Sequence, residues 1–128
     1  MIAVDTSALV AVVLGEEDAE RHLAELQRNV TRLSSVSLVE ASIVVHARQG
    51  PDAERDLGLL VEATIDELVP VDLDQARAAI SAWRRFGKGR HPASLNFGDC
   101  FAYAVAGMSD LPLLYKGDDF SQTDVRSV

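Results

Sequence analysis

The sequence contains little cysteine and few aromatic residues, and each shortage excludes a class of structure. Cys100 is the only cysteine among 128 residues, so an internal disulfide and a cysteine-rich zinc site are both excluded. A single thiol fits a reducing compartment such as the cytoplasm. Because aromatic residues make up 5% of the chain, the core has to be built mainly from alanine, valine, leucine and isoleucine.

Long apolar runs are also absent. The longest uncharged apolar segment, residues 8–14, is far too short to cross a bilayer. Asp5 interrupts the apolar run at the N-terminus, so no secretory signal is predicted. We therefore expect a soluble, cytoplasmic protein that does not associate with membranes.

Positive charge is scarce, with 12 Lys and Arg against 20 Asp and Glu and a net charge of −8. This balance disfavours sequence-independent binding to nucleic acid, so a polyanionic substrate needs a local basic patch. One such segment exists and contains Arg84, Arg85, Lys88, Arg90 and His91. Its ordinary structural explanation is a cationic helix C-terminus followed by a solvated loop.

Short apolar runs alternate with helical patterns, and 48% hydrophobic residues are enough for a true core. We expect strands at residues 2–4, 31–35, 68–71 and 112–115, with a further edge strand at 125–128. We expect helices at residues 7–14, 16–29, 37–49, 52–63, 73–86 and 97–108. This alternation predicts one α/β domain over residues 1–128, with a parallel sheet covered by helices on both faces.

Carboxylates occur where several of these strands end. Asp5 follows the first strand, Glu40 lies in the helix after the second, and the pair Asp118 and Asp119 follows residues 112–115. Such positions share the carboxyl edge of a parallel sheet, where ligands bind. Asp99 opens a helix after a loop, so the pattern alone does not place it at that edge.

Each acid also has an ordinary structural explanation. Asp5 suits a helix N-cap, and Asp99 suits the first turn of a helix capped by Asn96. The spacing Ser37-x-x-Glu40 is that of a capping box with Ser37 as the N-cap. Gly98, beside Asp99, allows something to approach the backbone closely, and residues 117–119 have the composition of a turn.

Taken together, the acids predict a metal site. Three or four carboxylates in close proximity cannot all stay ionised without a cation. Carboxylate oxygens and water select a hard divalent ion, Mg²⁺ or Mn²⁺, and no cluster of histidine or cysteine indicates zinc. Such a site activates water against a phosphodiester, and the basic segment could hold a nucleic-acid backbone beside it.

Four motifs occur in order along the chain: VDTSA at residues 4–8, SxxE at 37–40, NFGDCFAYA at 96–104 and LYKGDDF at 114–120. With these motifs the sequence resembles a PIN domain and, more narrowly, a VapC-type toxin of a bacterial toxin–antitoxin pair. The resemblance covers essentially the whole chain, and residues 85–93 are similar to the family's loop before the third acid.

The resemblance implies a PIN-like three-layer α/β sandwich and a Mg²⁺- or Mn²⁺-dependent endoribonuclease that cuts cellular RNA. It also implies a homodimer that is held inactive by a VapB-like antitoxin, in a hetero-oligomer with it. Asp5 and Asp99 would be the principal metal ligands, and Glu40 would complete the set directly or through water. The fourth acid would be Asp118 or Asp119, with Asp118 slightly favoured.

Side chains around these acids have implied roles too. Thr6 or Ser7 would orient Asp5 by hydrogen bonding. Lys88, Arg90 and His91 would contact the substrate.

Two other functions fit parts of the pattern. A receiver-like phosphoacceptor could use Asp5 for metal, Asp72 as acceptor and Lys116 as the lysine, although Asp72 is otherwise a simple N-cap. This alternative leaves Glu40 and Asp99 unexplained, and the first strand lacks a paired acid. A catalytically silent PIN-like binding module is the other alternative.

Overall fold

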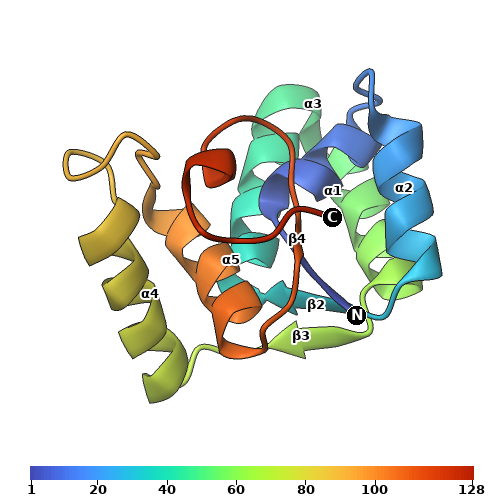
Figure 1. The fold of residues 1–128 in the computed structure, drawn as a ribbon. Coiled ribbons are helices and arrows are strands. Elements are labelled where there is room, and N and C mark those ends of the chain that lie inside the picture. Colours follow the sequence, from blue (N-terminus) through green and yellow to red (C-terminus); the bar gives the residue numbers. More distant parts are fainter.

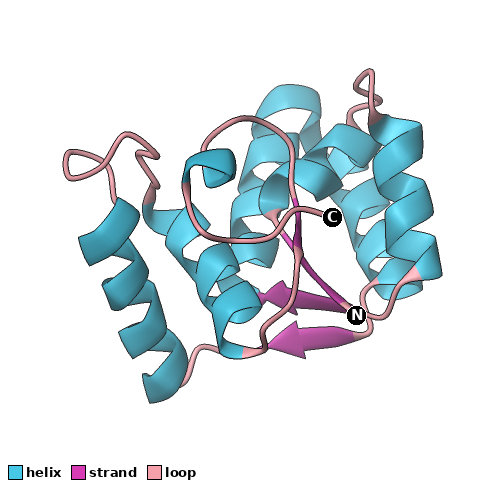
Figure 2. Cartoon of the chain, in the orientation of Figure 1, coloured by secondary structure: helices cyan, strands magenta, loops and turns pink.

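A computed structural model describes all residues, 1–128, and contains four parallel strands and five α-helices (Figures 1 and 2). In chain order the elements are β1 (Ile2–Val4), α1 (Thr6–Val13), α2 (Ala19–Arg28), β2 (Thr31–Ser34), α3 (Ser35–Thr64), β3 (Glu67–Val69), α4 (Leu73–Phe86), α5 (Phe97–Met108), β4 (Leu113–Leu114) and a short 3₁₀ helix (Phe120–Gln122). The prediction of an α/β fold is confirmed.

The strands are ordered β3-β2-β1-β4, so the first strand lies inside the sheet. Helices α1, α2 and α3 cover one face, and α4 and α5 cover the other (Figure 1). Side chains of β1 alternate between the two: Ala3 packs with α4 and α5, whereas Ile2 and Val4 pack with α1 and α3. No helix is both long and apolar enough to cross a membrane.

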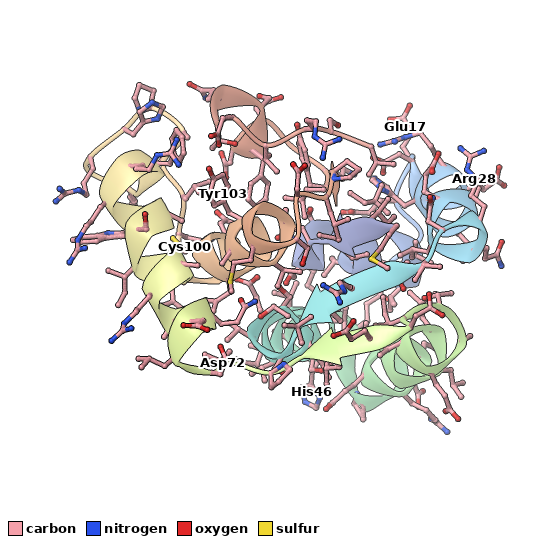
Figure 3. All side chains as sticks on the ribbon, turned by 60° about the horizontal axis from the view of Figure 1, so that its bottom comes forward. Glu17, Arg28, His46, Asp72, Cys100 and Tyr103 are labelled. Carbon is pink, nitrogen blue, oxygen red and sulfur yellow. The ribbon has the colours of Figure 1, made fainter.

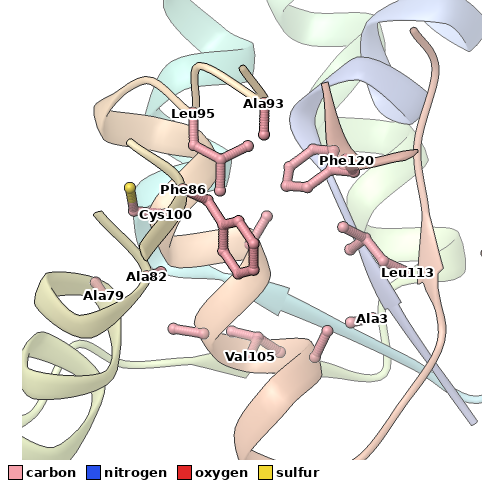
Figure 4. Packing of buried hydrophobic residues seen from close by; sticks show 13 residues of the cluster. Ala3, Ala79, Ala82, Phe86, Ala93, Leu95, Cys100, Val105, Leu113 and Phe120 are labelled. Carbon is pink, nitrogen blue, oxygen red and sulfur yellow. The ribbon is translucent and has the colours of Figure 1, made fainter. Parts of the chain in front are cut away.

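The core facing α4 and α5 is made largely of small residues (Figure 4). Alanines of α4 and α5 let these helices approach closely, and Phe86, Leu113 and Phe120 fill the remaining space. Phe120 is 2% exposed and anchors the segment after β4 to this core. Across both faces of the sheet the buried apolar residues are mainly alanine, valine, leucine and isoleucine, as predicted.

The break predicted between the helices at residues 37–49 and 52–63 is confirmed: α3 is divided by a kink at Gly50, where φ is 78° and the backbone is not helical. The main departure from the predicted elements is the start of α3, which lies at Ser35 rather than at residue 37. It begins directly after β2 because Ser34 caps it, accepting a hydrogen bond of 3.1 Å from the Val36 N–H. The predicted N-cap Ser37 is therefore wrong: it lies inside the helix, and its buried hydroxyl has no partner.

Differences elsewhere are small. Helix α2 begins at Ala19 rather than at residue 16. The predicted edge strand at residues 125–128 is reduced to a single bridge between Ser127 and Leu113.

Candidate active site

Asp5 lies at the carboxyl end of β1 and caps α1. Its Oδ2 accepts hydrogen bonds from the Ser7 N–H at 3.0 Å and the Ser7 hydroxyl at 2.6 Å. Its Oδ1 is buried and has no hydrogen-bond partner. Burial raises the pKa of Asp5 to about 6, although the bonds from Ser7 oppose this rise. The capping role predicted for Asp5 is confirmed, and it leaves one oxygen available for a ligand.

Asp99 lies in the first turn of α5, in a capping box with Asn96. The Asn96 Oδ1 accepts from the Asp99 N–H at 2.8 Å, and the Asp99 Oδ2 accepts from the Asn96 N–H at 3.0 Å. Burial raises the pKa of Asp99 to about 7, and the charges of Asp5, Glu40 and Asp119 also raise it. Packing of α5 against β1 and α3 thus brings Asp99 within electrostatic range of the other acids.

Glu40 reaches the same place from the second turn of α3. A Cβ built on Gly98 would overlap both carboxylate oxygens of Glu40, so the carboxylate lies directly against the first turn of α5. The charge of Glu40 also raises the pKa of Asp5. The close approach anticipated at Gly98 is therefore made by Glu40.

Asp118 and Asp119 lie in the exposed segment after β4. Of the two, only Asp119 is among the charges that raise the pKa of Asp99. The backbone carbonyl of Asp118 accepts a hydrogen bond from the Ser121 hydroxyl. The charge of Asp119 therefore affects Asp99 more than that of Asp118, for which the sequence interpretation had a slight preference.

Thr6 and Ser7 make different connections. The Thr6 hydroxyl donates to the Ser37 carbonyl at 3.0 Å and joins the start of α1 to α3. The Ser7 hydroxyl, which donates to Asp5, also accepts from the Lys116 N–H at 2.9 Å. Ser7 therefore links the segment that contains Asp118 and Asp119 to Asp5. No sequence pattern predicts the role of the Lys116 N–H, because every residue except proline has such a donor.

Two arginines of the basic segment, Arg85 and Arg90, form contacts with other side chains of the protein. Arg85 bonds the Asp124 carboxylate at 3.1 Å. The Arg90 guanidinium lies 4.7 Å from the Trp83 ring centroid, and its Nε donates to the Arg84 carbonyl.

The other two predicted substrate contacts differ from each other. The His91 Nδ1 accepts from the Ala93 N–H at 3.0 Å, within the loop itself. Lys88 forms no ion pair and lies at a mainly apolar pocket of about 630 Å³, which also contains Trp83 and Phe97. Of the three predicted contacts, Lys88 is the one whose charged group has neither a hydrogen bond nor an aromatic ring as a partner.

The geometry provides no receiver-like site. The Lys116 ammonium pairs with Glu16 at 3.3 Å and Asp18 at 3.2 Å. Asp72 lies where the chain passes from β3 to α4, and its carboxylate caps α4 by accepting from the Gln75 N–H (Figure 3). The acceptor and the lysine required for phosphoacceptor chemistry are therefore both engaged elsewhere.

No three side chains of His, Cys, Asp and Glu come close enough together to hold a metal ion by themselves. Asp5 and Asp99 nevertheless each have one oxygen held by a capping bond and another that is not used for it. This donor set suits a hard cation that keeps several waters, as Mg²⁺ usually does.

Comparisons with known proteins agree with this arrangement. The family model for the PIN domain matches residues 2–126. Ribonuclease VapC30 of Mycobacterium tuberculosis is 47% identical over 128 residues, which cover 99% of this chain and 98% of that protein. Ribonuclease VapC of Mycolicibacterium smegmatis is also 47% identical, with 99% of each chain covered.

Solved structures show the same fold at lower identity. VapC20 of Mycobacterium tuberculosis, described as a sarcin–ricin loop cleaving toxin, aligns with a TM-score of 0.81 and 21% identity over 100% of this chain and 98% of its own. A toxin–antitoxin complex from Klebsiella pneumoniae aligns with a TM-score of 0.73 and 17% identity, covering 97% of this chain and 93% of that one.

Proposed function

This chain belongs to the PIN domain family, and we propose that it is an endoribonuclease toxin of the VapC type that cuts cellular RNA in the cytoplasm. Two relatives that are 47% identical over nearly the whole chain are named ribonucleases, which supports this activity. We propose that residues 1–128 act as a single PIN-like domain.

The observation that carries the proposal is the pair of buried acids, Asp5 and Asp99, which have raised pKa values and no cationic partner. We propose that Mg²⁺ or Mn²⁺ binds between them, with water supplying most of the remaining ligands. Glu40 and Asp119 would complete the set through such waters. When bound, the ion activates water and stabilises negative charge that develops on the phosphate.

The chain's own residues prepare this site. Ser7 holds the Asp5 Oδ2, so that Oδ1 stays available. The Asn96 N–H holds the Asp99 Oδ2 in the same way. Lys88 supplies a positive charge for an RNA phosphate, since Arg85 and Arg90 are engaged locally.

We also propose that the chain forms a homodimer and is inhibited by a VapB-like antitoxin. The similarity to a chain in a toxin–antitoxin complex supports such a partner. Val39, Ile43 and Phe97 are 59%, 64% and 75% exposed and line one pocket together with Glu40. Exposed apolar side chains that lie together are typical of protein–protein interfaces.

The test is RNA cleavage by purified, antitoxin-free protein with Mg²⁺ or Mn²⁺. We expect EDTA to abolish cleavage, and Asp5→Asn and Asp99→Asn each to reduce the rate at least about 100-fold, because each removes a ligand charge. The matched control is Asp72→Asn, which keeps an equally good N-cap outside the site and should leave the rate unchanged.

Other outcomes would contradict the proposal. Cleavage that survives both substitutions would show that the site is elsewhere. RNA binding without any cleavage by the wild-type protein would support the binding module instead.

A further inference from the structure

Gly98 occupies a position where the backbone does not require glycine. It is buried in the first turn of α5, and its φ lies outside the left-handed region. Because glycine is among the poorest helix-forming residues, alanine would be preferred here on local grounds alone. The reason for glycine must therefore come from a neighbouring element.

That neighbour is Glu40 of α3. The Cβ of any larger residue at position 98 would overlap the Glu40 carboxylate, which fills the space that Gly98 leaves. Two other helical glycines with ordinary helical backbone differ: an added Cβ at Gly107 would meet only Tyr103, at 4.0 Å, and one at Gly58 would meet nothing within 4 Å.

We propose that Gly98 is a positioning residue, whose missing side chain creates the space in which the Glu40 carboxylate lies beside Asp99. This inference rests on the proposed function, in which Glu40 completes the acidic set. Glu40 is a flexible side chain on the half-exposed side of α3, so an added methyl group would displace the carboxylate rather than separate the two helices.

The proposal predicts that activity and stability change in opposite directions. In Gly98→Ala the better helix former should keep or raise the thermal midpoint. The displaced Glu40 should lower Mn²⁺ affinity and RNA cleavage about tenfold, the lower end of the range for residues that orient metal ligands. A residue with a merely structural role would change stability and activity together.

The experiment is a double-mutant cycle with wild type, Gly98→Ala, Glu40→Ala and the double variant. Thermal midpoints are measured without metal, Mn²⁺ affinity by calorimetry, and cleavage on one RNA. In the Glu40→Ala background, Gly98→Ala should raise the midpoint by about 3 °C and cause no further loss of Mn²⁺ affinity or cleavage. With Glu40 present, the midpoint should rise less.

Gly107→Ala, on the same helix, is the matched control and should leave cleavage unchanged in both backgrounds. The positioning role is overturned if Gly98→Ala lowers cleavage equally with and without Glu40, or does not lower it at all. If the wild type neither binds Mn²⁺ nor cleaves RNA, the proposed function fails and the positioning role fails with it. If the wild type does both and the cycle is additive, only the positioning role fails.

Discussion

The acidic edge of the sheet and the basic segment at residues 84–91 differ in whether their charged side chains are buried and whether they have partners within the chain. At the edge, Asp5 and Asp99 are 3% and 8% exposed and have no cationic partner, and both pKa values are raised. In the basic segment the lysine and arginine side chains are exposed, yet Arg85 forms an ion pair with Asp124 and the Arg90 guanidinium lies over the Trp83 ring.

The difference shows where an external ligand is needed. Buried carboxylates without partners are costly, so the acidic edge gains stability from any cation that binds there. The basic segment needs no ligand to be stable, because its cationic side chains are largely exposed to water and two of them, Arg85 and Arg90, also have partners within the chain. We therefore expect Lys88 to contribute more to binding of RNA phosphate than Arg85 does.

The largest expected effect is on stability as a function of pH. Because the folded chain raises the pKa values of Asp5 to about 6 and Asp99 to about 7, it binds more protons than the unfolded chain between pH 4 and 7. The free energy of unfolding without metal should fall by on the order of 3 kcal/mol between about pH 5 and pH 8.

Urea denaturation in EDTA measures this fall, and Mn²⁺ should restore stability at the higher pH. Asp5→Asn and Asp99→Asn, compared with the wild type, isolate the contribution of each group from that of other acids. If the free energy of unfolding of the wild type changes with pH as little as that of the variants, the acidic edge carries no buried charge.

A smaller effect is expected from Ser7→Ala, which removes the hydroxyl between Asp5 and the Lys116 amide. Cleavage should fall about tenfold and the free energy of unfolding by about 1 kcal/mol. Ser7→Thr should retain most activity because it keeps the hydroxyl. Thr6→Val, which removes the bond to α3, should cost similar stability and much less activity; equal losses of activity would contradict a specific role for Ser7.

The smallest effect distinguishes the cations of the basic segment. In an Asp99→Asn background, which prevents cleavage, Lys88→Ala should weaken RNA binding and reduce the slope of log affinity against log salt by about 1. Arg85→Ala should leave that slope unchanged and cost less than about 1 kcal/mol of stability. If Arg85→Ala changes the slope as much as Lys88→Ala does, the arginine is available to RNA despite its pairing.

Local patterns predicted most of the fold correctly. Helices α4 and α5 have the predicted bounds, and the capping bonds of Asp5, Asp72 and Asp99 are present. The predicted N-cap of α3 was wrong because serines at positions 34, 35 and 37 are all suitable caps. The end of β2 at Ser34 decides between them, and that end depends on pairing with β1 and β3.

The tertiary structure decides which of the acidic side chains lie close together. Asp99 follows α4 and the loop of residues 87–96, so no periodicity relates it to the strand ends. Asp119, and not Asp118, is among the charges that raise the pKa of Asp99, and its segment is held by the burial of the adjacent Phe120. A sequence shows that both aspartates occur in a turn, but not how the turn is oriented.

The sequence by itself determined the kind of chemistry: oxygen donors at strand ends, no zinc ligands and a parallel sheet with one edge for a ligand. Residue type and the period of the hydrophobic pattern are sufficient to predict these features, since the features depend on local backbone preference. Only the tertiary structure decided that α3 and α5 approach with Glu40 against Gly98, and that Arg85 is paired with Asp124. Both depend on contacts between residues far apart in the chain, which packing of the whole core creates.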